Sequence, residues 1–127
     1  MPAIASLGSG IRFIKHVGVN CIADSICYMS EMLCEALSDI KGINIYGSDN
    51  GIVSFNASGM MAEDVSRKLA EKGICVRGGL HCAPLAHKSI GTYDIGCVRA
   101  SISYFNTERE IKSFVNAVTK IINCRRA

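Results

Sequence analysis

The side chains best suited to covalent chemistry are gathered in one short segment, residues 77–86, with the sequence RGGLHCAPLA. Cys82 follows a pair of glycines in this segment, with His81 beside it and Arg77, His87 and Lys88 nearby. The thiolate is the nucleophilic form of cysteine and neighbouring cations favour it, whereas a cysteine among apolar residues stays inert. The other six cysteines lie mostly in apolar patterns. Cys82 is therefore predicted to be the most reactive thiol and a nucleophile in sulfur chemistry.

Other interpretations of the same segment stay open on local sequence alone. Cys82 is also compatible with a structural cysteine in a tight turn. His81, Cys82, His87 and Cys97 could together bind zinc, but they lack the paired spacing that is typical of zinc sites. The two glycines give the turn its backbone freedom, and they are too few to indicate a phosphate-binding loop.

Helical periodicity of the apolar residues dominates much of the remaining chain. It predicts one helix between Pro2 and Gly18, and a longer helix with Asn20 as its N-cap and Gly42 at its end. Two more helices are predicted, one over residues 61–72 and one that begins at a capping box in residues 107–110. The apolar positions of the first two helices are Ile4, Leu7, Ile11, Ile14, Ile22, Ile26, Met29, Leu33, Leu37 and Ile40.

Strand-like runs lie between these helices at residues 43–46, 52–55, 74–77 and 97–104. The first two flank a turn-rich loop and predict a hairpin. In the last run, alternation assigns Val98 and Ala100 to the core face and Arg99 to the opposite face. The elements together predict an α+β domain over residues 1–127. We expect a small antiparallel sheet of three or four strands, with helices packed on one face and a helical segment in front.

Composition excludes several classes of protein. The net charge is only +3 and the charges are scattered, so no basic stripe indicates nucleic-acid binding. No apolar run approaches the length of about 18 residues that a membrane-spanning helix needs. The seven cysteines are an odd number without a CxxC pair, which favours a reduced, cytoplasmic protein over a disulfide scaffold.

Three stretches resemble one known family: residues 76–83 (VRGGLHCA), residues 98–101 (VRAS) and residues 104–108 (YFNTE). Their order and spacing are similar to those in the C-terminal domain of the cysteine desulfurase and selenocysteine lyase family. These are class V, fold-type I aminotransferase relatives. The resemblance extends over nearly the whole chain, from Pro2 to Ile122. It implies the small domain of a pyridoxal-phosphate (PLP) lyase that removes sulfur from cysteine and leaves alanine and an enzyme persulfide.

The resemblance also implies roles for four residues. Cys82 matches the catalytic cysteine of the family, which attacks the substrate sulfur and becomes the persulfide. Arg99 matches the arginine that binds the substrate carboxylate, a role that suits a planar, bidentate guanidinium. Without the resemblance, Arg99 would be interpreted as a surface salt-bridge partner. Arg77 and His81 match positions that flank the substrate pocket.

The family's cofactor site has no counterpart in this sequence. The lysine that holds PLP, the aspartate that pairs with its ring nitrogen and the histidine that stacks on the ring belong to a large domain, and no lysine here matches that motif. The stretch that starts at Pro2 resembles the sequence just after a Gly-Thr pair that contacts the cofactor phosphate in relatives. We expect this chain alone to bind neither PLP nor a metal, and not to catalyse without the large domain.

Two hypotheses of function follow, and they belong to different classes. The first is the small domain of a cysteine desulfurase-like lyase, as a fragment, a truncated product or a separate subunit. A cysteine- or selenocysteine-type amino acid would then bind through the large PLP domain. The second is a stand-alone sulfur carrier, or an interaction module, that accepts persulfide on Cys82 without a cofactor. A sulfur-acceptor protein and a second copy of the chain are candidate partners, whereas we expect no nucleic acid and no membrane.

Overall fold

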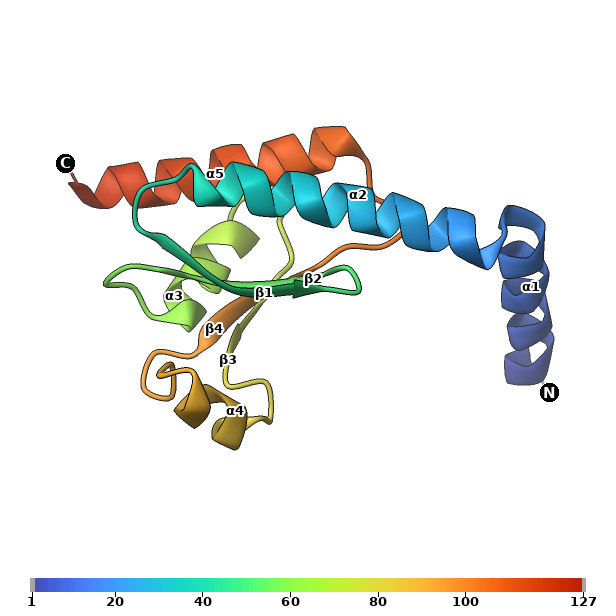
Figure 1. The fold of residues 1–127 in the computed structure, drawn as a ribbon, viewed down its shortest axis with the longest axis horizontal. Coiled ribbons are helices and arrows are strands. Elements are labelled where there is room, and N and C mark those ends of the chain that lie inside the picture. Colours follow the sequence, from blue (N-terminus) through green and yellow to red (C-terminus); the bar gives the residue numbers. More distant parts are fainter. Residues whose placement is uncertain (1, 127) are drawn as a thin grey trace.

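The computed structural model describes residues 2–126. Four antiparallel strands form a central sheet, with long helices along one of its faces (Figure 1). This arrangement confirms the predicted α+β class. In chain order the elements are α1 (Pro2–Val17), α2 (Val19–Ser38), β1 (Ile43–Asp49), β2 (Ile52–Ala57), α3 (Ala62–Ala70), β3 (Arg77–Gly79), α4 (Pro84–Ser89), β4 (Cys97–Ser101) and α5 (Glu108–Arg126).

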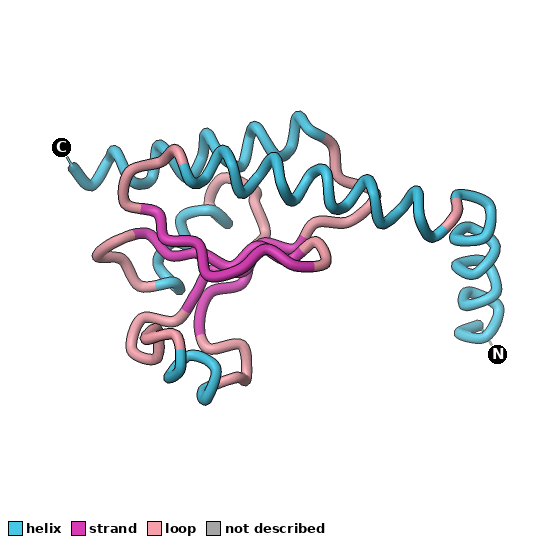
Figure 2. The backbone as a smooth tube through the Cα atoms, viewed as in Figure 1, coloured by secondary structure: helices cyan, strands magenta, loops and turns pink. Residues whose placement is uncertain are grey.

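The strands lie in the order β1-β2-β4-β3, so β4 is inside the sheet and β3 is an edge strand. Figure 2 shows the strands together in the middle of the fold, with the two long helices above them. The predicted hairpin is confirmed in β1 and β2, but its loop is shorter than residues 47–51. Asn50 and Gly51 close it with φ of 48° and 80°. Two successive residues with positive φ match the right-handed twist of the strands, and an Asn-Gly pair adopts them readily.

The hydrophobic core lies between the sheet and helices α2, α3 and α5. Val53 and Phe55 of β2, and Val98 and Ala100 of β4, are 5% exposed or less on this face. Arg99 lies between Val98 and Ala100 in β4, and its cross-strand partner in β2 is Ser54. Because side chains alternate along a strand, Arg99 faces the other side of the sheet, as predicted.

The boundaries of the second helix differ from the prediction. α2 begins at Val19, and Gly18, with φ of 92°, takes the N-cap position that was assigned to Asn20. A glycine can adopt this φ at little steric cost, so the chain turns one residue earlier than expected and Asn20 lies inside the first turn. The helix ends at Ser38, four residues before Gly42.

The edge strand is also displaced: β3 spans Arg77–Gly79, whereas residues 74–77 were predicted. The backbone of residues 74–76 bonds to α3 instead of to β4. Ile74 N–H donates to the Leu69 carbonyl at 3.0 Å, and the Val76 carbonyl accepts from Ser66 Oγ at 3.2 Å. β4 ends at Ser101 rather than at residue 104. A cavity of about 420 Å³ is lined by both segments, residues 74–76 and 100–102.

Helix α1 extends away from the sheet and contacts the start of α2 (Figure 1). Its predicted helical extent is confirmed, but its apolar stripe is not part of the core. The four stripe residues are between 44% and 68% exposed, and they are Ile4, Leu7, Ile11 and Ile14. Among residues 2–126, no helix has both the length and the apolar character that a membrane crossing requires.

Candidate active site

Two arginines stand opposite each other on the face of the sheet that α2, α3 and α5 leave open. Arg77 of β3 and Arg99 of β4 are cross-strand partners. Neither has a carboxylate partner among the described residues. The Nε atom of Arg99 is buried, and no described residue forms a hydrogen bond with it. Like charges in directly opposite positions destabilise a sheet, so this pair favours binding of an anion such as a carboxylate.

His81 follows β3, and its ring lies back against the sheet. Nε2 is 2.9 Å from the carbonyl oxygen of Cys97, the first residue of β4. Burial lowers the pKa of His81, the contact with the Cys97 carbonyl opposes this change, and the charges of Arg99 and Arg77 lower the pKa further. His81 is therefore mainly neutral at neutral pH. The cations that face this site are therefore the two arginines.

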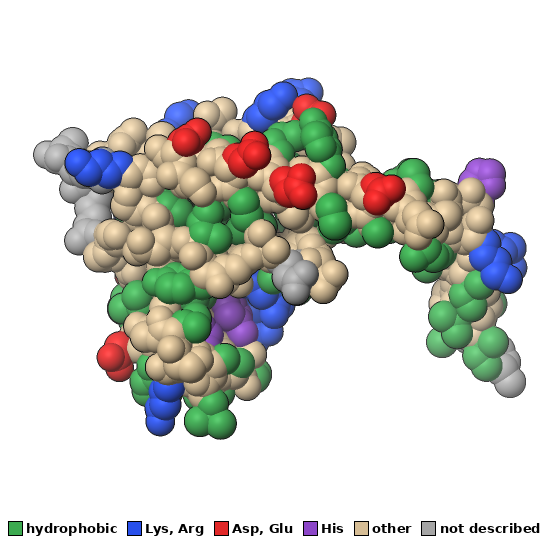
Figure 3. Space-filling view, in the orientation of Figure 1, with side chains coloured by type: hydrophobic (Ala, Val, Ile, Leu, Met, Phe, Trp, Pro, Cys, Tyr) green, Lys and Arg blue, Asp and Glu red, His purple; other side chains and the backbone are tan. Residues whose placement is uncertain are grey.

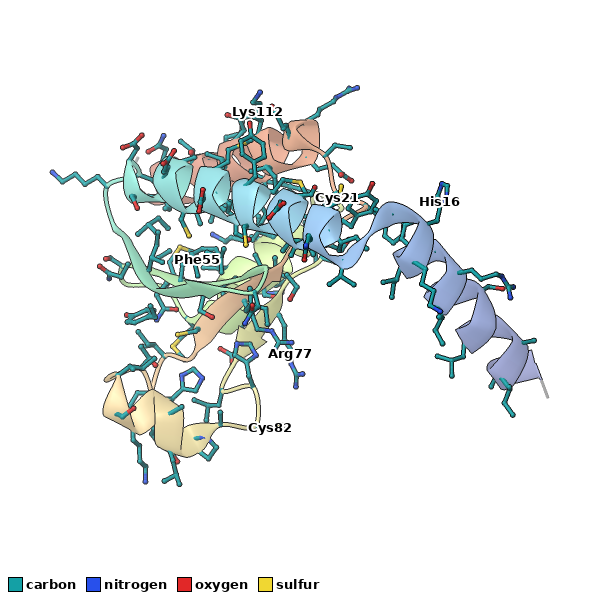
Figure 4. The ribbon with its side chains drawn as sticks, turned by 45° about the vertical axis from the view of Figure 1, so that its right-hand side comes forward. His16, Cys21, Phe55, Arg77, Cys82 and Lys112 are labelled. Carbon is teal, nitrogen blue, oxygen red and sulfur yellow. The ribbon has the colours of Figure 1, made fainter. Side chains whose placement is uncertain are left out.

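Cys82 occupies the turn between β3 and α4. It is the second of two consecutive residues with left-handed backbone, with φ of 52° at His81 and 59° at Cys82. This conformation costs about 1–3 kcal/mol in residues other than glycine, and such residues are concentrated at functional sites. Cys82 is exposed and its thiol is free. Figure 4 shows Cys82 and Arg77 on one side of the sheet, with Lys112 of α5 on the other.

A buried polar pair joins α4, the helix after this turn, to the loop that follows it. His87 and Thr92 are 5% and 1% exposed, and His87 Nδ1 lies 2.8 Å from Thr92 Oγ1. The ring centres of His87 and His81 are 6.0 Å apart. In Figure 3 a histidine surface lies beside cationic side chains in the hollow between the sheet and α4. No sequence pattern predicted α4 or singled out Thr92, because a helix of six residues is too short to show a periodic pattern. Pro84 in the first turn was the available signal.

The other thiols, which the sequence places mostly in apolar patterns, differ widely in exposure. Cys97 is only 2% exposed, and burial raises its pKa. Cys21, Cys27, Cys75 and Cys124 are exposed, like Cys82. Exposure therefore does not distinguish Cys82, and its turn and cationic neighbours do. Within residues 2–126, no three His, Cys, Asp or Glu side chains are grouped as metal ligands.

The 420 Å³ cavity does not coincide with this site. Ala100 and Ser101 line it at the end of β4, whereas His81 binds to Cys97 at the start of the same strand. The candidate site is thus an open sheet face bordered by a turn. The grouping of Arg77, Arg99, His81 and Cys82 indicates a site because two guanidinium groups stand opposite each other beside a free thiol. The lining of the cavity includes Lys72 and the thiol of Cys75, but no such pair of arginines.

Comparison with known sequences gives consistent matches. The aminotransferase class-V family model matches residues 1–114. A probable cysteine desulfurase of Methanothermobacter thermautotrophicus is 41% identical over 111 residues, which are 84% of this chain and 28% of that protein. A cysteine desulfurase of Shigella flexneri is 32% identical over 125 residues, 93% of this chain and 29% of that protein. The chain thus spans less than a third of these two relatives.

Solved structures share the fold. The apo structure of a cysteine desulfurase from Thermococcus onnurineus NA1 aligns with a TM-score of 0.85 and 31% identity, over 92% of this chain and 30% of that one. A cysteine desulfurase of Escherichia coli in an S-sulfonic acid form aligns with a TM-score of 0.82 and 24% identity, over 89% and 28% of the two chains. Because the family model extends from α1 into α5, the chain belongs to the aminotransferase class-V family.

Proposed function

We propose that this chain supplies the sulfur-accepting cysteine and the carboxylate-binding arginine of a cysteine desulfurase-like PLP lyase. The observation that carries the proposal is the pair Arg77 and Arg99, which lack acidic partners among the described residues, beside the turn that exposes Cys82. The 41% identical relative, a probable cysteine desulfurase, supports it. The substrate would be a cysteine- or selenocysteine-type amino acid.

In the proposed reaction the arginines and Cys82 have different roles. Arg99 binds the substrate carboxylate through its planar guanidinium, and Arg77 adds positive charge on the same face. Cys82 Sγ forms a bond to the substrate sulfur while the substrate C–S bond breaks, which leaves a persulfide on Cys82 and alanine as the other product. PLP, when bound, would hold the amino acid and withdraw electron density from it.

The residues of this site do not fit PLP by themselves. PLP is held covalently by a lysine amine, and the site consists of guanidinium, imidazole and thiol groups. Lys88, the lysine of α4, has its Nζ 5.0 Å from the centre of the Tyr93 ring, in a cation–π contact. The same donors fit the carboxylate and sulfur of an amino acid. We infer that the cofactor is held by the part of the relatives that this chain does not match. The family is PLP-dependent, and one similar structure, a C-DES mutant, carries glycine covalently linked to its PLP cofactor.

A second candidate function is that of a sulfur carrier, which receives persulfide from another protein. Exposure of Cys82 on this chain favours it, because a carrier thiol must reach both a donor and an acceptor. The two candidates differ in one respect: the lyase takes sulfur directly from the amino acid, and the carrier takes it from a protein persulfide.

One experiment with two arms tests both. In the first arm the chain is mixed with L-cysteine, PLP and the remaining part of the Methanothermobacter relative. The peptide that contains Cys82 is then expected to gain the mass of one sulfur atom. In the second arm a complete cysteine desulfurase is the donor, and loading in this arm alone indicates a carrier. Cys82→Ser should abolish loading, whereas Cys27→Ser, at another exposed thiol, should not. Absence of sulfur from Cys82 in both arms contradicts both functions.

A further inference from the structure

His81 has one defined tautomer because of the group that its distal ring nitrogen faces. Nε2 lies 2.9 Å from the carbonyl oxygen of Cys97. A carbonyl oxygen can only accept a hydrogen bond, so Nε2 carries the proton and donates it. In a neutral ring Nδ1 is then unprotonated, and it is available as a proton acceptor.

The surroundings keep this ring neutral. Burial is the main cause that lowers the pKa of His81, and the charges of Arg99, Arg77 and His87 add to it, against the effect of the Cys97 carbonyl. These groups come from β4, β3 and α4, the elements around the ring. Nδ1 is buried, and no described residue donates a hydrogen bond to it. A buried acceptor without a donor is costly, and it calls for an explanation such as a catalytic role.

Of the groups around this ring and next to it in the chain, the Cys82 thiol is the one that has to lose its proton in the proposed sulfur transfer. Guanidinium groups do not lose a proton in proteins, so the two site arginines are excluded. His87 uses its Nδ1 in a contact of 2.8 Å with a threonine hydroxyl, and Cys97 is buried with a raised pKa. The thiol of Cys82 is left, on the next residue of the chain. Of the two ring nitrogens, Nδ1 is the one closer to the main chain of His81, and Cys82 is the next residue.

We propose that His81 Nδ1 is the general base that accepts the Cys82 proton as Sγ attacks sulfur, a role that rests on the proposed function. In this step the S–H bond of Cys82 breaks and its proton moves to Nδ1, while Sγ forms the S–S bond. The substrate C–S bond breaks, and its electron pair goes to the carbon that carried the sulfur. The two sulfurs are oxidised to a persulfide and that carbon is reduced, so no other oxidant is needed. The Cys97 carbonyl stabilises the imidazolium that forms.

The pH dependence of thiol alkylation tests this role on the chain itself. With limiting iodoacetamide, the rate at Cys82 is measured relative to exposed Cys27 by peptide mass spectrometry. In the wild type the relative rate should stay high down to pH values below the ordinary histidine pKa of about 6.5. In His81→Gln, whose amide can still donate to the Cys97 carbonyl, it should be about tenfold or more lower near pH 6.5. The difference should vanish above about pH 9.5, where an ordinary thiol ionises unaided.

Two controls separate this effect from a loss of structure. His16→Gln, on exposed α1, should match the wild type at every pH. Cys97 should stay protected from the reagent in all variants, because it is buried in the folded chain. Labelling of Cys97 would show that the start of β4 has become exposed. Identical pH profiles of His81→Gln and the wild type, with Cys97 protected in both, would overturn the proposal.

A second measurement needs no substitution. Long-range proton–nitrogen correlation spectra of the wild-type chain at neutral pH should show His81 neutral, with the proton on Nε2 and a bare Nδ1. A protonated Nδ1 at neutral pH would exclude it as the base. Failure of the proposed function looks different: Cys82 would then take up no sulfur in either loading arm, whatever the alkylation profile. Normal sulfur loading with unaltered alkylation in His81→Gln rejects the His81 role alone.

Discussion

At the scale of residues, the site depends on two guanidinium groups that have no acidic partner in the described part of the chain. Arg77 and Arg99 face each other across β3 and β4, and each would be stabilised by a carboxylate between them. Arg67 differs, because it already pairs with Asp64 on the exposed surface of α3. An exposed salt bridge of that kind contributes little. The two kinds of arginine should therefore respond differently to substitution.

We expect Arg99→Ala to lower kcat/KM for cysteine about tenfold to a hundredfold, in an enzyme completed with the cofactor-binding part of the relative. The loss of a charge-assisted bidentate contact corresponds to about 1.5–3 kcal/mol. Arg99→Lys should recover only part of the activity, since an ammonium lacks the planar fork. Steady-state kinetics measures the effect, with Arg67→Ala as the unaffected control. An unchanged kcat/KM in folded Arg99→Ala would mean that Arg99 is a surface residue.

Cys82 should give a different kind of defect. Cys82→Ala is expected to bind substrate as the wild type does, because the arginines and the cofactor are retained, but to stop sulfur transfer because the acceptor thiol is missing. Substrate binding is followed by the absorbance of the cofactor, and sulfur transfer by the release of alanine. Loss of both signals together would indicate that the turn positions the substrate as well as accepting sulfur.

At the scale of elements, β3 can pack beneath α3 because residue 78 has no side chain. A Cβ atom on Gly78 would lie 2.4 Å from the carbonyl oxygen of Ala62 and 2.8 Å from the backbone nitrogen of Glu63. Both are backbone atoms at the start of α3, so neither can move aside cheaply. The close approach fixes the strand that carries Arg77.

Gly78→Ala should therefore lower the free energy of unfolding by about 3 kcal/mol, toward the upper end of what overpacking costs. Gly47→Ala is the matched control, since a Cβ there meets nothing within 4 Å. It should change stability by less than about 0.5 kcal/mol. Urea unfolding of both variants gives the comparison. Equal stability of the two variants would show that α3 shifts freely over β3.

The predicted capping box of α5 is confirmed by reciprocal bonds. Thr107 N–H donates to Glu110 Oε2 at 2.8 Å, and Glu110 N–H donates to Thr107 Oγ1 at 3.3 Å. The bonds from the backbone and side chain of Thr107 lower the pKa of Glu110. The carboxylate form is therefore the one that the folded helix favours, and its contribution is complete above the ordinary carboxyl pKa.

Thr107→Ala should lower the free energy of unfolding at neutral pH by about 1 kcal/mol, the usual cost of losing an N-cap. The carboxylate's share of this effect is lost as pH falls through the lowered pKa of Glu110, because the protonated acid no longer accepts both bonds. Unfolding of Thr107→Ala and the wild type at neutral and acidic pH checks the sign. A difference in stability that grows on acidification contradicts the capping role of the carboxylate.

At the scale of the whole molecule, two apolar stripes of the same helical period differ in burial. In α2 the stripe residues Met29, Leu33 and Leu37 are buried, and Leu33 is 1% exposed. In α1 the helix extends away from the sheet, and Leu7 is 63% exposed. Local periodicity is equal in the two helices, so the difference arises only from what each helix packs against.

Truncation of the two leucines should therefore have different effects on the free energy of unfolding. Leu33→Ala should cost about 3 kcal/mol, since it opens a cavity in the core. Leu7→Ala should stay within about 0.5 kcal/mol. Urea unfolding at low protein concentration measures both. A large cost for Leu7→Ala that rises with protein concentration would mean that α1 is buried against a second copy of the chain.

The sequence by itself determined the features that depend on neighbours in the chain. Helical periodicity and the capping signal identified α1, α2, α3 and α5, and strand alternation assigned Arg99 to the face away from the core. The residues around Cys82 identified the candidate nucleophile and, through their resemblance, the family. Local signals sufficed here because hydrogen bonds within a helix, and alternation within a strand, span only a few residues.

Only the tertiary structure decided the features that join distant parts of the chain. It brought Arg77 opposite Arg99, and it directed His81 Nε2 to the carbonyl of Cys97, sixteen residues away. It also left the stripe of α1 exposed and displaced β3 from residues 74–77, because the backbone of residues 74–76 bonds to α3. Such contacts, and the protonation of a half-buried ring between two strands and a helix, depend on long-range packing that no local pattern encodes.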